Sequence, residues 1–189
     1  MNLKNHKLIL ASGSPRRQQF FRELGLAFEI RLKEVEETYP DHLQAQQITD
    51  FLARLKADAF ELSENEILVS SDTIVWLEDE ALGKPLNYEE AFVTLRKISG
   101  KTHQVITSVC LKSTEKTKIF NDITLVTFAE LSDEMIRFYL DNYKPFDKAG
   151  AYGIQEWIGL VGIEKIEGSY TNVVGLPTQK FYNELLCFI

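Results

Sequence analysis

The sequence has too few cysteines and histidines, and too little positive charge, for several large classes of protein. It contains two cysteines and three histidines in 189 residues, and neither set has metal-site or disulfide spacing. This scarcity favours a reducing, cytoplasmic setting. The net charge is −7, whereas a general nucleic-acid binder is more commonly basic. We therefore expect no nucleic-acid partner, and we expect any phosphate-binding site to be a local basic patch on an acidic protein.

Long apolar runs and flexible linkers are also missing. No apolar run is long enough to span a bilayer, and the run within residues 7–12 is too short for the core of a signal peptide. No internal repeat, low-complexity stretch or Pro/Gly/Ser-rich linker divides the chain. We therefore expect a single domain over residues 1–189, with no membrane partner.

Helical and strand patterns alternate along the chain, which predicts an α/β protein. Two long β-branched segments joined by a short polar turn predict an antiparallel hairpin, so the sheet should be mixed rather than purely parallel. Residues 157–177 combine apolar residues with glycines, and we expect short strands and turns there. Strands are expected over 7–12, 28–32, 67–78, 103–111 and 118–130, and helices from 15, over 44–61, 88–98 and 132–142, and at the C-terminus.

The stretch LASGSPRR has the pattern of an anion site. Ser14 can cap a helix that begins at Pro15, and this puts Arg16 and Arg17 in the first turn, where the helix dipole disfavours cations. An anion bound there would be stabilised by the N–H groups, by the Ser12 and Ser14 hydroxyls and by the arginines. The alternative is a solvated helix start with surface arginines, and spacing alone does not separate the two. The stretch is not a P-loop, because G-x-x-x-x-G-K-[ST] is absent.

Acidic residues supply candidate metal ligands. Asp72 interrupts the strongly β-forming run SSDTIVW, where a carboxylate is costly unless it is paired or bound to a cation. It could bind a divalent metal or accept a proton from water. Glu34, Glu36 and Glu37 lie in a short acidic loop. The alternatives are an Asp72 on a wet strand face and a merely solvated loop.

Three lysines and two glycine-rich loops are further candidates for a binding site. Lys56, Lys84 and Lys148, each taken alone, are most simply surface lysines. The turn GKP would aim Lys84 rigidly. The loops AGAYGIQ and GSYTNVVGLP could accommodate a flat ring, and the Gln155 amide offers both a donor and an acceptor to an imide edge. Ordinary tight turns are the alternative.

Taken together, these segments resemble the Maf family of nucleoside triphosphate pyrophosphatases. The resemblance implies an elongated mixed sheet flanked by helices, with two lobes around a central cleft, related to the inosine triphosphate pyrophosphatases. It also implies cleavage of a nucleoside triphosphate between the α- and β-phosphates with Mg²⁺ or Mn²⁺. The matching segments, in chain order, are LASGSPRR, VEE, LARLKA, SSDTIV, GKP, LRKISGKTHQVITSV, DKAGAYGIQ and GSYTNVVGLP.

The GAYGIQ form resembles the branch of the family that acts on dTTP and UTP. The resemblance implies that Asp72 is the catalytic proton acceptor and that Arg16, Thr73 and Gln155 select the pyrimidine. We expect a metal on Glu37 and Asp72. The residues expected to bind the phosphates are Ser12, Ser14, Arg17, Lys56 and Lys84, with Arg16 helping to hold them.

Two positions depart from the family pattern, and alternative functions remain open. Glu36 stands where much of the family has aspartate, and Lys144 reverses a charge in the segment before DKAG. The alternatives are the branch that acts on 7-methyl-GTP, a pyrophosphatase of modified nucleotides, and a nucleotide-binding regulator of cell division with little catalysis. The family resemblance also suggests a homodimer.

Overall fold

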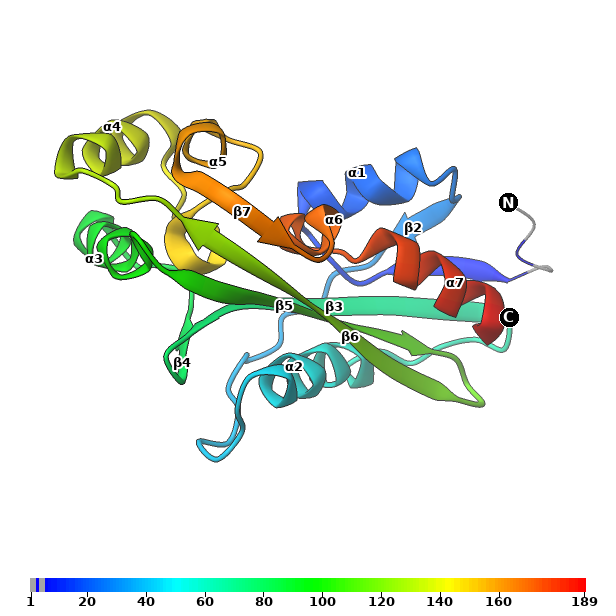
Figure 1. Ribbon diagram of the computed structural model, residues 1–189. Helices are drawn as coiled ribbons and strands as arrows, with labels where there is room; N and C mark the ends of the chain where they lie inside the picture. The colour runs from blue at the N-terminus through cyan, green and yellow to red at the C-terminus, as the bar shows by residue number, and fades with distance from the viewer. Residues whose placement is uncertain (1–2, 4–5) are drawn as a thin grey trace. The chain divides into compact units, whose positions relative to one another are not determined.

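The computed structural model describes residue 3 and residues 6–189, which form a mixed α/β fold (Figure 1). The predicted α/β class is confirmed. No helix in the described part of the chain has both the length and the apolar character that a bilayer crossing requires. The strands are β1 (Lys7–Leu10), β2 (Phe28–Ile30), β3 (Glu66–Leu77), β4 (Glu80–Leu82), β5 (Thr102–Lys112), β6 (Thr117–Phe128) and β7 (Ile163–Glu167). The helices are α1 (Pro15–Glu23), α2 (Gln46–Asp58), α3 (Tyr88–Ile98), α4 (Asp133–Tyr143), the 3-10 turn η1 (Ala149–Ala151), α5 (Trp157–Gly162), α6 (Tyr170–Val174) and α7 (Thr178–Phe188).

Over the described residues the strands form one seven-stranded sheet in the order β2-β1-β3-β5-β6-β7, with β4 paired to β3. Strand β1 runs parallel to both β2 and β3, and the connections that make this possible contain α1 and α2. The β3–β4 and β6–β7 pairs are antiparallel. The sheet is therefore mixed, as predicted.

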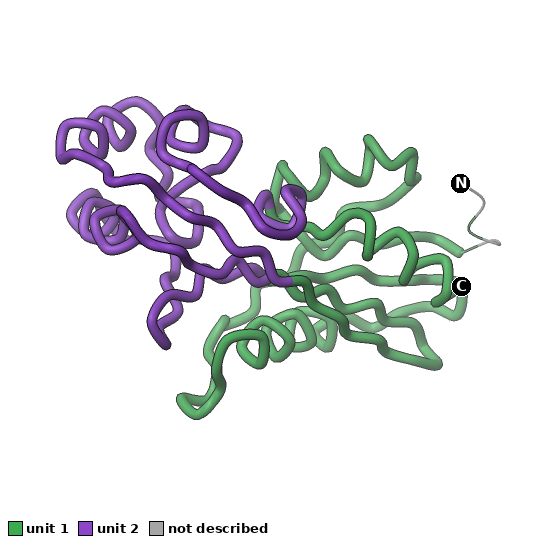
Figure 2. The backbone as a smooth tube through the Cα atoms, viewed as in Figure 1, with its two compact units in different colours: residues 1–72, 107–122, 175–189 green, residues 73–106, 123–174 purple. Residues whose placement is uncertain are grey.

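The chain divides into two compact units (Figure 2). The first contains residues 1–72, 107–122 and 175–189, and the second contains residues 73–106 and 123–174. The unit boundaries fall inside β3, β5 and β6, so each of these strands contributes to both units. The two units correspond to the two expected lobes, and the cleft remains a prediction.

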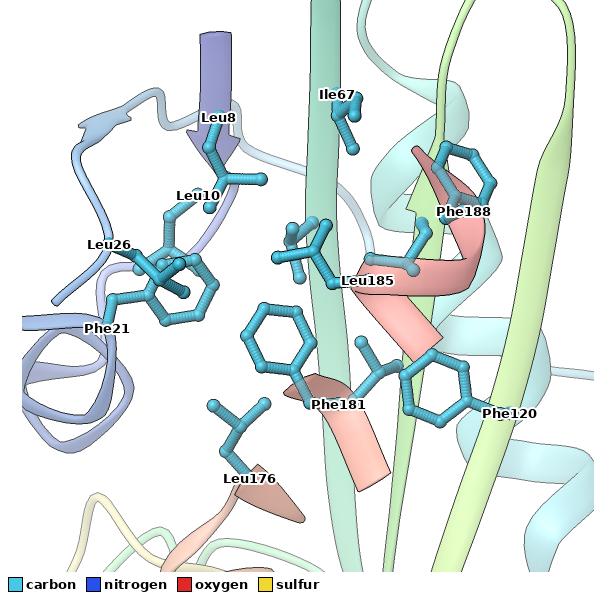
Figure 3. Close-up of a cluster of buried hydrophobic side chains, with 13 residues drawn as sticks. Leu8, Leu10, Phe21, Leu26, Ile67, Phe120, Leu176, Phe181, Leu185 and Phe188 are labelled. Carbon is cyan, nitrogen blue, oxygen red and sulfur yellow. The ribbon is translucent and has the colours of Figure 1, made fainter. Parts of the chain in front are cut away.

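The first unit buries both faces of its strands. On one face, Leu8 and Leu10 of β1 pack with side chains of α1 and α7, among them Phe21 and Phe181, whose rings stack 5.0 Å apart (Figure 3). On the other face, Ile9 packs with Ala53 and Ala57 of α2. Alternate residues of β1 thus face opposite helices. This explains why its sequence is continuously apolar rather than alternating.

The second unit contains helices that the sequence did not reveal. We expected only short strands and turns over 157–177, but α5 and α6 are helices and only β7 is a strand, so this prediction was wrong in part. Helices of five or six residues are too short to develop a 3.6-residue apolar repeat. The glycine that suggested a turn, Gly159, is helical, and a Cβ there would overlap the carbonyl oxygen of Ile154. The hairpin strand β4 was also missed.

A partly buried ion pair joins Arg31, which follows β2, to Glu66, the first residue of β3. Glu66 is 6% exposed, and both of its carboxylate oxygens accept hydrogen bonds from the Arg31 guanidinium. Its Oε2 also accepts from the Ser63 N–H at 3.1 Å. The Arg31 hydrogen bonds, followed by the Ser63 N–H, lower the pKa of Glu66 to about 2. Glu66 therefore stabilises the fold above its unfolded pKa, and this stabilisation is lost as pH falls toward 2.

We expect Glu66→Gln to flatten the acid branch of the stability profile. Between roughly pH 5 and pH 2 the wild-type unfolded state binds a proton that the folded Glu66 does not, so the free energy of unfolding falls with pH. The amide cannot titrate, and the variant should lose this part of the slope. Urea unfolding across that range measures it, with Glu64→Gln at an exposed neighbouring carboxylate as the control. Equal slopes in the variant and the wild type would contradict the assignment.

Candidate active site

The middle of β3 carries polar side chains in an otherwise apolar strand. The Ser70 hydroxyl donates to the Ala53 carbonyl of α2 at 2.6 Å. Asp72 lies two residues further on, so it shares the face of β3 that α2 covers. The Ser70 hydrogen bond helps to fix where α2 lies along the strand. It thereby helps to bring Lys56, one turn further along α2, opposite Asp72.

Lys56 lies between two carboxylates. Its Nζ donates to Asp72 Oδ1 at 2.7 Å and lies 3.0 Å from Glu37 Oε2. The side chains of Lys56 and Asp72 are 16% and 10% exposed, whereas Glu37, in an irregular loop, is 47% exposed. Burying a carboxylate without a partner is strongly unfavourable. Lys56 thus compensates the burial of Asp72 and ties the acidic loop to α2.

Helix α1 begins as the sequence predicted. Pro15 is its first residue, and the N-cap Ser14 hydroxyl accepts from the Arg17 N–H at 3.5 Å. The Ser12 hydroxyl accepts from the Ser14 N–H at 3.3 Å. These two N–H groups are therefore occupied by serine oxygens. A serine hydroxyl that accepts a hydrogen bond still carries its own proton to donate, so the serines remain possible donors to an anion.

Arg17 connects this helix start to β3. Its Nη1 donates to the Ser71 carbonyl at 3.0 Å and to Ser12 Oγ at 3.4 Å, and its Nε donates to the Gly175 carbonyl at 2.9 Å. Burial lowers the pKa of Arg17 and the nearby Asp72 carboxylate opposes this shift, but a guanidinium remains charged in any case. Since Ser71 precedes Asp72, Arg17 holds the basic helix start beside the strand acid.

In the second unit, the turn that carries Lys84 is joined to the GAYGIQ segment. The Gly150 N–H donates to the Gly83 carbonyl at 3.1 Å. Gly150 has φ +69°, and a Cβ there would lie 2.7 Å from Val75 Cγ2 on β3. Glycine is therefore required at 150 both for its backbone conformation and for the close approach to β3.

A hydrogen-bonded network brackets Gln155. The Tyr139 hydroxyl accepts from the Gly153 N–H at 2.9 Å and donates to a carboxylate oxygen of Glu156. The other Glu156 oxygen lies 3.0 Å from Lys148 Nζ. Burial and the Glu156 carboxylate raise the pKa of Tyr139, so its hydroxyl stays protonated. Residues on both sides of the exposed Gln155 are thus held by one buried tyrosine and its ion pair.

A second buried pair holds the start of the same loop. His103 Nε2 and the Tyr152 hydroxyl are hydrogen-bonded at 2.8 Å, and the Tyr152 ring packs edge-on against Phe128 at 5.0 Å. Burial lowers the pKa of His103 to about 4. The imidazole is therefore neutral at pH 7, and its contribution here is to position Tyr152.

The predicted site residues are divided between the two units. The structure brings Glu37, Lys56 and Asp72 into direct contact, and Ser12, Ser14 and Arg17 into one hydrogen-bonded group. The functional roles assigned to all of these residues remain predictions. The first unit contains Ser12, Ser14, Arg16, Arg17, Glu37, Lys56 and Asp72, and the second contains Thr73, Lys84 and Gln155.

Comparison with known proteins decides the family. The family described as Maf-like protein matches residues 7–188. The chain belongs to the Maf family. A Flavobacterium psychrophilum protein named dTTP/UTP pyrophosphatase is 66% identical over 185 residues, covering 97% of this chain and 95% of that protein. A Flavobacterium johnsoniae protein of the same name is 61% identical over 189 residues, covering 99% and 97%. The resemblance noted in the sequence is thus confirmed.

A solved structure supports the fold of this Maf-like chain. A HAM1 protein from Coxiella burnetii covers 96% of this chain and 98% of its own, with a TM-score of 0.53 and 14% sequence identity. At that identity the likeness concerns the fold alone. It agrees with the α/β architecture expected from the sequence.

The carboxylates of this Maf-like protein suit a hard divalent cation. No three His, Cys, Asp or Glu side chains gather as a ligand set within the described residues. Mg²⁺, however, is commonly held by one or two carboxylates, with waters and substrate phosphates completing its shell. Glu37 and Asp72 already converge on one cation, the Lys56 ammonium. Two carboxylates that share a cation are a donor set that fits Mg²⁺ or Mn²⁺.

Sequence reasoning missed the residues that support the site. Ser70 entered the sequence analysis only as a letter of the run SSDTIVW, and Tyr139 and Glu156 were not singled out. In the sequence, Tyr139 looks like one more apolar residue of an amphipathic helix. In the structure it is fully buried. Its role depends on contacts with residues 14 and 17 positions away, which no local pattern encodes.

Proposed function

We propose that the protein hydrolyses the pyrimidine nucleoside triphosphates dTTP and UTP between the α- and β-phosphates. The observation that carries the proposal is the Arg17–Ser71 hydrogen bond, which joins a basic helix start to the strand position beside a buried, lysine-paired aspartate. Such a site can hold a polyanion next to a proton acceptor. The names of the highly identical relatives supply the substrate class.

In the proposed reaction Asp72 orients a water molecule and accepts its proton as the water oxygen attacks the α-phosphorus. The bond from the α-phosphorus to the bridging oxygen breaks, and pyrophosphate leaves with the electron pair. A divalent cation held by Glu37 and Asp72 would neutralise charge on the phosphate oxygens. Catalysis then rests mainly on positioning and charge neutralisation.

The phosphates are proposed to lie on the helix start and the neighbouring cations. A bidentate guanidinium suits phosphate oxygens, and a lysine ammonium acts as a point charge. Because Arg17 already donates to two backbone carbonyls, we assign it a structural role beside its phosphate contact. The proposed phosphate-binding residues are Ser12, Ser14, Arg16, Arg17, Lys56 and Lys84.

Base selection is proposed to depend on Gln155 and Thr73, with Arg16 contributing. The amide of Gln155 can donate to and accept from the imide edge of thymine or uracil. The same amide can also flip, which exchanges the positions of its donor and its acceptor. Its selectivity for the base therefore depends on a fixed loop. The network of Tyr139 and Glu156 supports this part of the proposal, because it holds the residues on either side of Gln155.

We expect Tyr139→Phe to weaken base selection more than turnover. The change keeps the buried ring but leaves the Gly153 N–H without its acceptor and Glu156 without its donor, which costs about 1–3 kcal/mol of stability or loop order. KM for UTP should rise several-fold and the preference for UTP over CTP should fall, whereas kcat should change little. Steady-state kinetics with both nucleotides measures this.

The matched control is Tyr143→Phe, which removes a hydroxyl from the half-exposed ring that stacks on Tyr139 at 5.3 Å. This control should leave kcat and KM for UTP and for CTP unchanged. If Tyr139→Phe kept the wild-type UTP preference while its Tm fell, the network would be structural only and the positioning role would be lost.

The test of the function is pyrophosphate release from dTTP, UTP, CTP, dUTP and 7-methyl-GTP at fixed Mg²⁺, and again without metal. Preference for dTTP and UTP supports the proposal. Preference for 7-methyl-GTP or a modified nucleotide would favour those alternatives. Binding without release from any nucleotide would favour the regulator of cell division.

We further propose a single catalytic domain over residues 1–189 that acts on free nucleotides in the cytoplasm, with neither nucleic acid nor membrane as partner, and that assembles as a homodimer. Light scattering on the purified protein tests the assembly. One cooperative transition in calorimetry would support the single domain, and two separate transitions would contradict it.

A further inference from the structure

Lys56 contacts both of the carboxylates to which the proposed function assigns a metal. Its ammonium contacts Asp72 Oδ1 at 2.7 Å and Glu37 Oε2 at 3.0 Å, and these are the two carboxylates that the proposed function assigns to the cation. A divalent ion and an ammonium that contact the same carboxylate oxygens repel each other, and the repulsion is strongest at Asp72, whose side chain is 10% exposed and little screened by solvent. The two cations must therefore compete.

We propose that Lys56 is an exchangeable counter-ion, which holds the carboxylates in the absence of metal and moves to the triphosphate when metal and nucleotide bind. The inference rests on the proposed function. Exchange makes binding of the two ligands cooperative. Metal alone must displace the ammonium from both of its carboxylate partners, whereas the nucleotide offers the displaced ammonium its phosphates.

The chemistry of the side chain suits exchange. Lysine carries a compact charge on a flexible four-carbon stem, whereas the fork of arginine is rigid. The helix that carries Lys56 is fixed, since the Ser70 hydroxyl donates to the Ala53 carbonyl one turn away and Ala53 and Ala57 are fully buried. The ammonium can therefore change partners while α2 keeps its place.

The test is Mn²⁺ affinity measured by electron paramagnetic resonance of the free ion, first without nucleotide. Lys56→Met should bind Mn²⁺ more tightly than wild type, by about 5- to 150-fold, the usual range of a coupling between two ligands. The same titration with a non-hydrolysable dTTP analogue should show strong cooperativity in wild type. In the variant the cooperativity should be smaller, because only the direct attraction between the metal and the phosphates remains, and by reciprocity the reduction must be the same for either order of addition.

The matched control is Lys112→Met. Lys112 also pairs with an aspartate of α2, at 2.8 Å from Asp58, and its side chain is 20% exposed. Its removal changes the net charge equally and should leave Mn²⁺ affinity unchanged. The double variant Lys56→Met with Asp72→Asn should lose the gain, because the gain requires the Asp72 carboxylate. Lys56→Gln, which keeps a hydrogen-bond donor, replaces the methionine variant if that one does not fold.

Equal Mn²⁺ affinities in wild type and the Lys56 variants would overturn the exchange, as would an equal gain in Lys112→Met or tight binding in the double variant. These outcomes are separate from the proposed function, which is tested by pyrophosphate release from the wild-type protein and fails if dTTP and UTP are not its preferred substrates.

Discussion

Replacing Asp72 with asparagine is expected to lower kcat for dTTP by about 10²- to 10⁴-fold, the usual contribution of a positioned general acid or base. Asparagine keeps the size of the side chain and can still face Lys56, but it cannot accept the proton of the attacking water. The loss should therefore fall mainly on kcat rather than KM. Pyrophosphate release at saturating Mg²⁺ and saturating dTTP measures it.

The control for this variant is Asp58→Asn. Asp58 is also a carboxylate paired to a lysine in the first unit, at 2.8 Å from Lys112 Nζ, and it lies on α2 two residues beyond Lys56. The control therefore breaks a more exposed aspartate–lysine pair, with the Asp58 side chain 50% exposed against 10% for Asp72, without touching the proposed water. It should keep the parental kcat. Parental turnover in Asp72→Asn under saturating metal would show that this carboxylate is not the proton acceptor.

The fold was predictable where an element is long enough to show a repeating apolar pattern. Strand β3 and the pair β5 and β6 run for 11 or 12 residues, and α2 shows a clear 3.6-residue repeat, so their existence and type followed from the sequence. Helices α5 and α6 have six and five residues, and the glycines within 157–177 resembled turns. In α5, the glycine at 159 allows a close approach of the backbone to the Ile154 carbonyl, and a contact of that kind leaves no periodic signal.

The candidate site was predictable as a set of residues but not as a set of contacts. The polar interruption of a β-forming run pointed to Asp72, and a serine and proline before two arginines pointed to the helix start. The partner of Asp72 lies 16 residues away on another element, and Arg17 reaches the carbonyl of Gly175, 158 residues away. Such pairs depend on how α2 and α7 pack on the sheet, and a single sequence does not encode that packing locally.

Reversing the charge of Arg16 should abolish tight triphosphate binding. A charge-assisted hydrogen bond to phosphate is worth about 1.5–3 kcal/mol, so removing it weakens binding roughly 10- to 10²-fold, and the added repulsion of Arg16→Glu weakens it further. Glutamate in the first turn of α1 interacts favourably with the helix dipole. Calorimetric titration with a non-hydrolysable dTTP analogue measures the affinity, and thermal unfolding measures the stability.

Arg22→Glu is the matched control, because it should lower stability and leave binding of the analogue unchanged. Arg22 is exposed in the last turn of the same helix, where a cation is favoured and a glutamate is disfavoured by a similar amount. This variant should unfold at a lower temperature and bind the analogue normally, whereas Arg16→Glu should bind it poorly. The two variants carry the same net charge, so non-specific repulsion of the nucleotide by a more acidic protein would weaken both alike. Parental affinity in Arg16→Glu would remove this arginine from the phosphate site.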